Sequence, residues 1–226
     1  MLIPGLLASA RMYAAQVPQL WRAGPVMIAD HTRDDSMGGI ARRILSAAPA
    51  RFALAGLSMG GYIAFEVLRQ APQRIAKVAL LDTSARADAP EQTAMRRAQM
   101  TLASQGRLAE VVEQQFPRLV QRARRADVEL RQLFDLMAQE VGAAGFIRQQ
   151  TAILGRADSR ATLGSIRCPT LVLVGEGDEL TPPELAAEIA AGIPGARLTT
   201  VPQCGHMSTL EQPDEVSRAL LEWLEA

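Results

Sequence analysis

The arrangement of apolar residues limits the folds open to this chain more than any other feature. Short apolar runs alternate with longer stretches in which apolar residues recur at helical spacing. Runs that are apolar at successive positions are typical of parallel strands covered by helices on both faces of a sheet. We predict strands at 25–29, 51–56, 75–81, 170–174 and 196–201, and helices at about 9–20, 37–47, 59–71, 182–191 and 212–225. The alternation predicts a doubly wound, mostly parallel α/β sheet of about six strands.

The middle of the chain departs from this alternation. Between about residues 89 and 155 there is no convincing strand, and helix-forming residues dominate. Breaks between helices are expected at Gly106, at Pro117 and at the pair Gly142 and Gly145. Because this connection far exceeds the usual length between strands, we predict a helical cap at residues 86–159 over one end of the sheet. Residues 1–85 and 160–226 then form the core.

The composition excludes several classes of protein. Hydrophobic residues make up 48% of the 226 residues and charged residues 21%, as in ordinary globular proteins and unlike disordered ones. The 24 basic and 24 acidic side chains cancel, so no electrostatic footprint for nucleic acid or an anionic membrane is present. Cys168 and Cys204 do not make a disulfide framework or a zinc-ligand cluster. We expect neither a metal nor a cofactor.

Nothing in the sequence predicts a membrane location. No stretch approaches the roughly 20 unbroken apolar residues that a bilayer-spanning helix needs. Residues 1–10 resemble a signal peptide that ends in Ala-Ser-Ala, but they lack a basic leader and are interrupted by Pro4 and Gly5. We therefore expect a cytoplasmic protein that has neither a membrane nor a nucleic acid as partner.

A nucleophile motif stands where a predicted strand meets a predicted helix. Residues 56–60 read G-L-S-M-G, which is the G-x-S-x-G pattern. In this setting the serine sits on a strained turn, and small residues at Gly56 and Gly60 let neighbouring backbone pass closely. The amides at the start of the helix, near Met59, point toward developing negative charge. We interpret Ser58 as a nucleophile rather than as part of an ordinary tight turn.

A serine nucleophile needs a base, and the chain has only two histidines. His206 follows the last predicted strand and precedes the last helix, which places it at the carboxyl end of the sheet, where open α/β sheets bind ligands. His31 follows another predicted strand end and precedes a polar turn, so we interpret it as a loop histidine near the rim of the site. His206 is our choice for the base.

The base in turn needs a carboxylate that fixes its tautomer. Asp178 follows the strand at 170–174 on a glycine turn, from which it can reach a histidine on the next strand. Glu176 and Glu179 are rivals that can instead be solvated loop charges. Asp82 is a weaker rival, because at the end of its strand its expected role is to turn the chain.

The chain order Ser58, Asp178, His206 is that of nucleophile, acid and base in the α/β-hydrolases. The chain resembles this family over nearly its whole length, from residues 2–5 through the G-x-S-x-G motif to G-x-G-D at 175–178 and C-G-H-M at 204–207. The resemblance implies the α/β-hydrolase fold, a triad of these three residues and a helical cap. It also implies an oxyanion hole made by the backbone amides of Met59 and Leu6.

Two features depart from the usual pattern of the family. The first loop of relatives usually reads His-Gly-x, whereas this chain has Pro4 before Gly5 and Leu6, which removes a side chain that could brace the loop. Relatives also usually carry strands before this loop, which this chain reaches at residue 4. We therefore expect residues 26–29 to form a bare sheet edge that pairs with a second copy of the chain or is covered by the 9–20 helix.

The leading interpretation is a serine hydrolase that cleaves small-molecule carboxylic esters of small to medium acyl groups through an acyl-enzyme. The same triad supports lactone, thioester or carbon–carbon bond hydrolysis, and the same fold supports a ligand-binding receptor without turnover. An adaptable apolar acyl pocket is expected from some of the cap's apolar residues. The candidates are Met95, Met100, Leu102, Phe116, Leu133, Phe134, Met137, Phe146 and Leu154.

Overall fold

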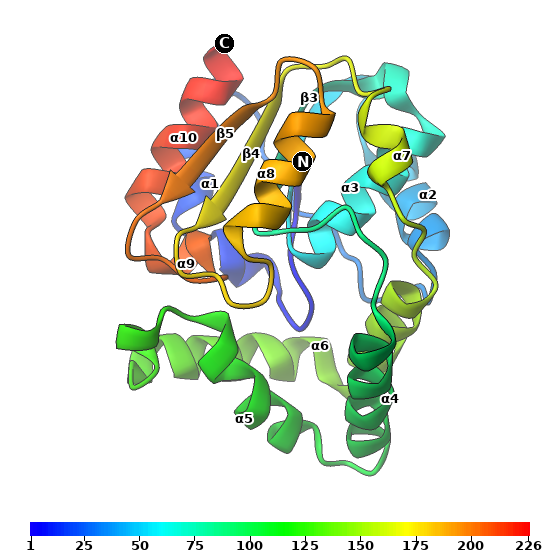
Figure 1. The fold of residues 1–226 in the computed structure, drawn as a ribbon, viewed down its shortest axis with the longest axis vertical. Coiled ribbons are helices and arrows are strands. Elements are labelled where there is room, and N and C mark those ends of the chain that lie inside the picture. The colour runs from blue at the N-terminus through cyan, green and yellow to red at the C-terminus, as the bar shows by residue number, and fades with distance from the viewer.

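The computed structural model describes all 226 residues and contains one five-stranded parallel sheet (Figure 1). In both spatial and chain order the strands are β1 (Leu2–Ile3), β2 (Phe52–Leu57), β3 (Ile75–Leu81), β4 (Thr170–Gly175) and β5 (Arg197–Val201). Every neighbouring pair is parallel. The predicted doubly wound α/β fold is confirmed, with one strand fewer than expected.

Helices cover both faces of the sheet, as the strands' apolar character on both faces predicts. In β4, Leu171 and Leu173 belong to one apolar cluster and Val172 and Val174 to the other, because successive side chains point to opposite faces. The first cluster packs under α1 (Gln16–Leu20) and α10 (Pro213–Glu225). The second packs under α2 (Met37–Ala47), α3 (Met59–Gln70), α7 (Arg160–Leu163) and α8 (Pro183–Gly192).

The strand predicted at residues 25–29 is replaced by a single bridge. The Leu2 amide donates to the Met27 carbonyl oxygen at 2.8 Å, and the Ala29 amide donates to the Leu2 carbonyl oxygen at 2.9 Å. A longer ladder of hydrogen bonds does not form, because Pro4 ends β1 after two residues. The segment lies on the outer side of β1, with Met27 39% exposed, and its pairing with a second copy stays a prediction.

The helix predicted at about 9–20 is broken into two pieces, and a third short piece lies just beyond its end. A 3₁₀ turn at Ala10–Tyr13 precedes α1, and a second one at Trp21–Ala23 follows it. Pro18 lies inside the predicted helix, where it lacks an amide hydrogen and its ring crowds the preceding turn. The proline therefore prevents one continuous helix and leaves α1 with only five residues.

Between β3 and β4 the chain forms helices only. They are α4 (Pro90–Ser104), α5 (Leu108–Leu119), a 3₁₀ turn at Arg122–Arg124 and α6 (Val128–Leu154), followed by α7. Figure 1 shows α4, α5 and α6, which we call the cap layer, beyond the ends of the sheet toward which the β4 and β5 arrows point. The boundaries 86 and 159 stay a prediction. None of the helices combines the length and apolar composition needed to cross a bilayer.

The predicted break points within the cap layer have different outcomes. Gly106 lies between α4 and α5, as expected. Gly142 interrupts α6, where its φ of 68° is a left-handed conformation that glycine adopts without strain. Pro117 does not end its helix but lies inside the last turn of α5, where few backbone hydrogen bonds are lost.

A buried ion cluster joins the start of the cap layer to its end. Asp88, just before α4, pairs with Arg96 at 2.6 Å and with Arg156, just after α6, at 2.7 Å. The Asp88 side chain is 5% exposed, and those of Arg96 and Arg156 are 13% and 6% exposed. Arg96 also donates to Gln150 of α6 at 2.9 Å. The two chain connections to the cap layer are therefore held together by one shared carboxylate.

Replacing that carboxylate is expected to destabilise the protein. Asp88→Asn leaves two buried guanidinium groups without a counter-charge, so we expect a loss of about 3 kcal/mol in the free energy of unfolding. The control is Asp158→Asn, whose pair with Arg160 is exposed and is expected to contribute less than about 1 kcal/mol. Urea denaturation of the three proteins measures both losses, and equal losses would contradict a structural role for the cluster.

Candidate active site

Ser58 lies on a tight turn between β2 and α3 that glycine makes possible. Its φ of 55° and ψ of −114° are strained for a residue with a side chain. A Cβ on Gly56 would lie 2.2 Å from the Gly60 carbonyl oxygen, and a Cβ on Gly60 would lie 2.1 Å from the Ile3 carbonyl oxygen. Both distances are too short for a Cβ atom and an oxygen atom that are not bonded. The G-x-S-x-G spacing therefore permits this turn and leaves the serine side chain at the carboxyl end of the sheet.

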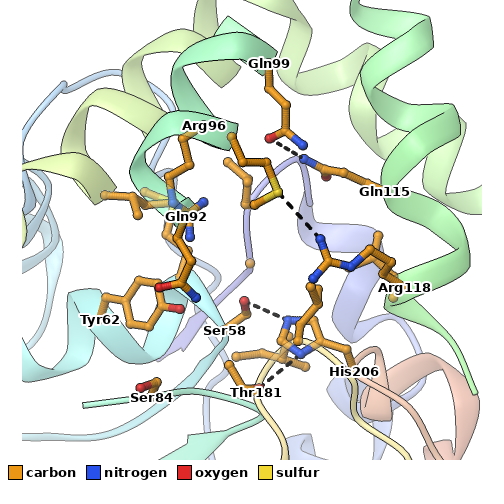
Figure 2. A pocket seen from close by; sticks show the side chains of 18 of the residues that line it. Ser58, Tyr62, Ser84, Gln92, Arg96, Gln99, Gln115, Arg118, Thr181 and His206 are labelled. Atoms are coloured by element: carbon orange, nitrogen blue, oxygen red, sulfur yellow. Dashed lines mark hydrogen bonds between the residues drawn. The ribbon is translucent and has the colours of Figure 1, made fainter. Parts of the chain in front are cut away.

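His206 and Asp178 lie beside Ser58 in one hydrogen-bonded line, of which Figure 2 shows the contact between Ser58 and His206. His206 Nε2 is 2.8 Å from Ser58 Oγ, and His206 Nδ1 is 2.8 Å from Asp178 Oδ2. His206 is 3% exposed and Asp178 2%. Asp178 comes from the loop after β4 and His206 from the loop after β5, so three strand ends bring the predicted residues together. In this line the imidazole can take a proton from the serine hydroxyl while the carboxylate stabilises the resulting charge.

Thr181, which sequence reasoning missed, fixes the Asp178 carboxylate. The Thr181 amide donates to Asp178 Oδ1 at 2.9 Å and its hydroxyl donates to Oδ2 at 2.7 Å. The Leu180 amide also donates to Oδ1, at 2.8 Å. Asp178 thus accepts from the amides two and three residues after it, as in turns that an aspartate side chain stabilises. The D-x-x-T sequence at 178–181 could have indicated this turn.

The rival acids lie elsewhere. Glu179 pairs with Arg122 and Arg125 at the surface, and Glu176 contacts only the Gln203 amide, at 3.4 Å. Asp82 turns the chain with a φ of 44°, as expected for its position. Its carboxyl group is also fully buried, accepting from the Gly175 amide at 2.9 Å and from the Ser208 hydroxyl. Asp82 therefore joins the end of β4 to the loop that carries His206, without a hydrogen bond to the imidazole.

His31 is not the rim residue that the sequence suggested. It is 2% exposed, and its Nε2 lies 2.8 Å from the Gly5 carbonyl oxygen and 3.0 Å from Gln149 Nε2. Gln149, from α6, accepts a hydrogen bond from the Leu7 amide at 3.2 Å. The interpretation failed because a polar turn in sequence does not reveal that α6 packs over it. Together His31 and Gln149 brace the loop that lacks the usual histidine at Pro4.

Two residues that line the cavity with Ser58 have backbone amides without an acceptor in the protein. In the loop after β1, the Gly5 and Leu7 amides donate to Met12 Sδ and Gln149 Oε1, whereas the Leu6 amide donates to nothing. Met59 is the first residue of α3, where amides have no partner within the helix. Leu6 and Met59 both line the same cavity as Ser58. These are the two amides that the resemblance to α/β-hydrolases implies for an oxyanion hole.

The cavity above Ser58 has a volume of about 360 Å³ and lies between the sheet and the cap layer. Its lower wall includes Met12, Leu57 and Met207 from the core. Of the cap residues predicted to form an apolar pocket, Met95 and Phe134 line it. The other predicted residues do not line it, and some of them, including Phe116, Met137 and Phe146, are buried in the helix core.

Burial and charge act in opposite directions on the titrating groups. Burial acts to lower the pKa of His206, but the adjacent Asp178 carboxylate outweighs it and raises the pKa above 6.5. Burial acts to raise the pKa of Asp178, and the imidazole of His206 with the Thr181 hydrogen bonds lowers it below its ordinary value. Burial, with the Asp178 charge, raises the pKa of Asp82 well above its ordinary value. No group of three or more His, Cys, Asp or Glu side chains is placed to hold a metal ion.

The alpha/beta hydrolase family model matches residues 2–219. The chain belongs to the alpha/beta hydrolase family. Nearly the whole of this hydrolase, from β1 into α10, lies within the match, so the cap layer is included. The fold and the order of the three site residues agree with that membership.

Relatives of this hydrolase carry different activities in their names. One similar structure is an esterase from Thermogutta terrifontis, solved with malate bound, which is 29% identical. The alignment covers 99% of this chain and 88% of the esterase, with a TM-score of 0.89. A pimeloyl-[acyl-carrier protein] methyl ester esterase of Chromobacterium violaceum is 30% identical over 75% of this chain and 68% of the relative. A putative non-heme bromoperoxidase of Mycobacterium tuberculosis is 27% identical over 79% of this chain and 69% of the relative. The family thus identifies a hydrolase and leaves its substrate open.

The two histidines are expected to titrate on opposite sides of pH 6.5. Burial lowers the pKa of His31, whereas Asp178 raises that of His206. In Asp178→Asn the imidazolium of His206 loses its counter-charge while the burial remains, so the pKa of His206 falls and that of His31 stays constant. Imidazole NMR signals followed from pH 4 to 9 measure both values. An unchanged His206 titration in the variant would contradict the assigned contact.

Proposed function

We propose that this protein is a serine hydrolase that cleaves carboxylic esters of small to medium acyl groups through an acyl-enzyme. The observation that carries the proposal is the hydrogen-bonded line from Ser58 Oγ through His206 to Asp178, which opens into a cavity of about 360 Å³. Serine hydroxyls are poor nucleophiles unless a positioned base takes their proton, and here the base and its orienting carboxylate are both in contact distance.

In the proposed reaction, Ser58 Oγ attacks the acyl carbon while His206 Nε2 takes the hydroxyl proton. Asp178 holds Nδ1 as the protonated nitrogen and stabilises the imidazolium. The amides of Leu6 and Met59 bind the oxygen of the tetrahedral intermediate, where the start of α3 adds a favourable dipole. His206 returns the proton to the departing alcohol. Water then attacks the acyl-enzyme while His206 takes its proton, and His206 gives that proton to Ser58 Oγ as the acid product leaves.

Ester hydrolysis is preferred to the alternatives for two reasons. Two of the similar proteins are named as esterases, and both are at least 29% identical to this chain. A receptor without turnover does not need a base that contacts a strained serine at 2.8 Å. Lactone, thioester and carbon–carbon bond hydrolysis use the same residues, so a panel of substrates has to separate them from ester cleavage.

Removing the nucleophile tests the proposal directly. Ser58→Ala is expected to lower the turnover of para-nitrophenyl esters by up to about a million-fold, because no other group can form the acyl-enzyme. Ser46→Ala, at an exposed serine on α2, is the control and should keep wild-type rates. A panel from acetate to decanoate defines the preferred acyl length. If the Ser58 variant, purified and folded, keeps more than a few per cent of the activity, the nucleophile is wrong.

Loosening the brace of the Leu6 loop should slow the reaction without weakening substrate binding. Gln149→Leu deletes the acceptor of the Leu7 amide, so the neighbouring Leu6 amide loses its fixed position. We expect kcat to fall by roughly ten- to a hundred-fold, less than for the loss of an oxyanion donor itself, with a nearly constant KM. Thr151→Val, on an exposed position of the same helix, is the control. A normal kcat in a well-folded Gln149→Leu protein would rule out the brace.

A further inference from the structure

The charged side chains that line the cavity are all positive. They are the four arginines Arg86, Arg96, Arg118 and Arg156, and no aspartate or glutamate is among the 27 lining residues. The chain as a whole has 24 basic and 24 acidic side chains, so this one-sided lining is a local property of the cavity. A wall of one sign favours a ligand of the opposite sign.

Three of the four arginines are already engaged by carboxylates. Arg86 makes two hydrogen bonds to Glu188, both of 3.0 Å. Arg96 and Arg156 share Asp88 in the buried ion cluster described above. In this cluster two guanidinium charges face one carboxylate. A net positive charge therefore remains where Arg96 and Arg156 line the cavity.

Arg118 has no carboxylate partner. It lies on α5, and its only hydrogen bond in the protein joins Nη1 to the thioether sulfur of Met95, on α4, at 3.5 Å. Figure 2 shows the Arg118 side chain reaching from α5 across the cavity toward this sulfur on α4. A thioether is a weak acceptor, so an incoming anion replaces it at little cost. Arg118 is an exposed residue, so its guanidinium is open to an incoming carboxylate, which it can bind through two parallel hydrogen bonds.

A second donor without a partner in the protein lines the same cavity. Gln99, on α4, is 7% exposed, and its Oε1 accepts from Gln115 and from Gln150 at 3.2 and 3.1 Å. Its own amide nitrogen donates to no group of the protein. This nitrogen is not sealed off from the cavity, so it is free to donate to an oxygen-bearing ligand there.

We propose that the substrate of this hydrolase is an ester that carries a free carboxylate remote from the scissile bond, and that Arg118 binds this carboxylate with Gln99 as an additional donor. The proposal rests on the proposed ester hydrolysis and specifies its substrate class. The ester carbon lies at Ser58 while the carboxylate is held under the cap layer, so Arg118 selects the substrate and takes no part in proton transfer.

The test compares charged and neutral esters of equal length. Selectivity is the ratio of kcat/KM for monomethyl adipate to kcat/KM for dimethyl adipate. We expect the wild type to prefer the monoanion and Arg118→Met to lower this selectivity by about ten- to a hundred-fold, which is the typical effect of a hydrogen bond to a charged group. Arg118→Lys restores part of it. Monomethyl adipate carries its carboxylate on the acyl part, whereas acetoxy acids carry it on the alcohol part. Comparing the two kinds of ester shows which part of the substrate Arg118 binds.

The matched control is Arg97→Met. Arg97 is an exposed arginine on α4 that does not line the cavity, so its loss lowers the overall charge equally but should leave the selectivity unchanged. A wild type that prefers the dimethyl ester, or equal selectivities in wild type and Arg118→Met, would overturn the proposal.

A binding measurement separates this proposal from the proposed ester hydrolysis. Calorimetric titration of the Ser58→Ala protein with monomethyl adipate requires no turnover. We expect binding that weakens with added salt and weakens about tenfold or more in Ser58→Ala/Arg118→Met. If the esters are not cleaved but this binding is seen, the proposed function fails and the carboxylate site stands. Equal affinity in the two proteins would exclude Arg118 as the carboxylate site.

Discussion

The contact between α3 and β1 is the constraint on which the rest of the site depends. Gly60 lies against the backbone of Ile3 with no room for a Cβ, so the helix that begins after Ser58 is fixed relative to β1. Leu6 follows β1 by only three residues. The serine and the loop that carries the free Leu6 amide are therefore positioned by one backbone contact, and neither can shift without the other. Preorganised donors of this kind stabilise charge without reorganising during a reaction.

Buried carboxyl groups hold the loops of His206 and Asp178 in the same way. Asp82 links Gly175, at the end of β4, to Ser208, two residues after His206. Glu211 accepts from the Gly205 amide at 3.0 Å and from the Gln121 amide at 2.8 Å, which ties the histidine loop to the segment after α5. Burial and the Asp178 charge raise the pKa of Asp82, whereas the imidazole of His206 outweighs burial and holds the pKa of Asp178 below its ordinary value. Asp178 is therefore the carboxyl group that keeps its negative charge more readily beside the imidazole.

Most of the fold and the three central site residues follow from local sequence patterns. Strands that are buried on both faces, such as β3, are visible as apolar runs, and the G-x-S-x-G motif marks a turn that only glycine permits. Residues 25–29 have the same apolar character but form only a bridge, because their partner strand is too short. The contacts of His31 and Gln149 depend on how the cap layer packs on the core, and the place of Arg118 on how α5 lies beside α4, which no local pattern encodes.

The left-handed break at Gly142 divides α6 into two parts that run in different directions. The part of α6 after Gly142 carries Gln149, which holds the Leu7 amide, and ends beside the ion cluster of Asp88 and Arg156. Contacts near its middle and near its end thus fix this part of the helix. Because only glycine adopts this φ without strain, Gly142 sets the direction in which the second half of α6 approaches the Leu6 loop, and a residue with a side chain there would strain the element that holds the Leu7 amide.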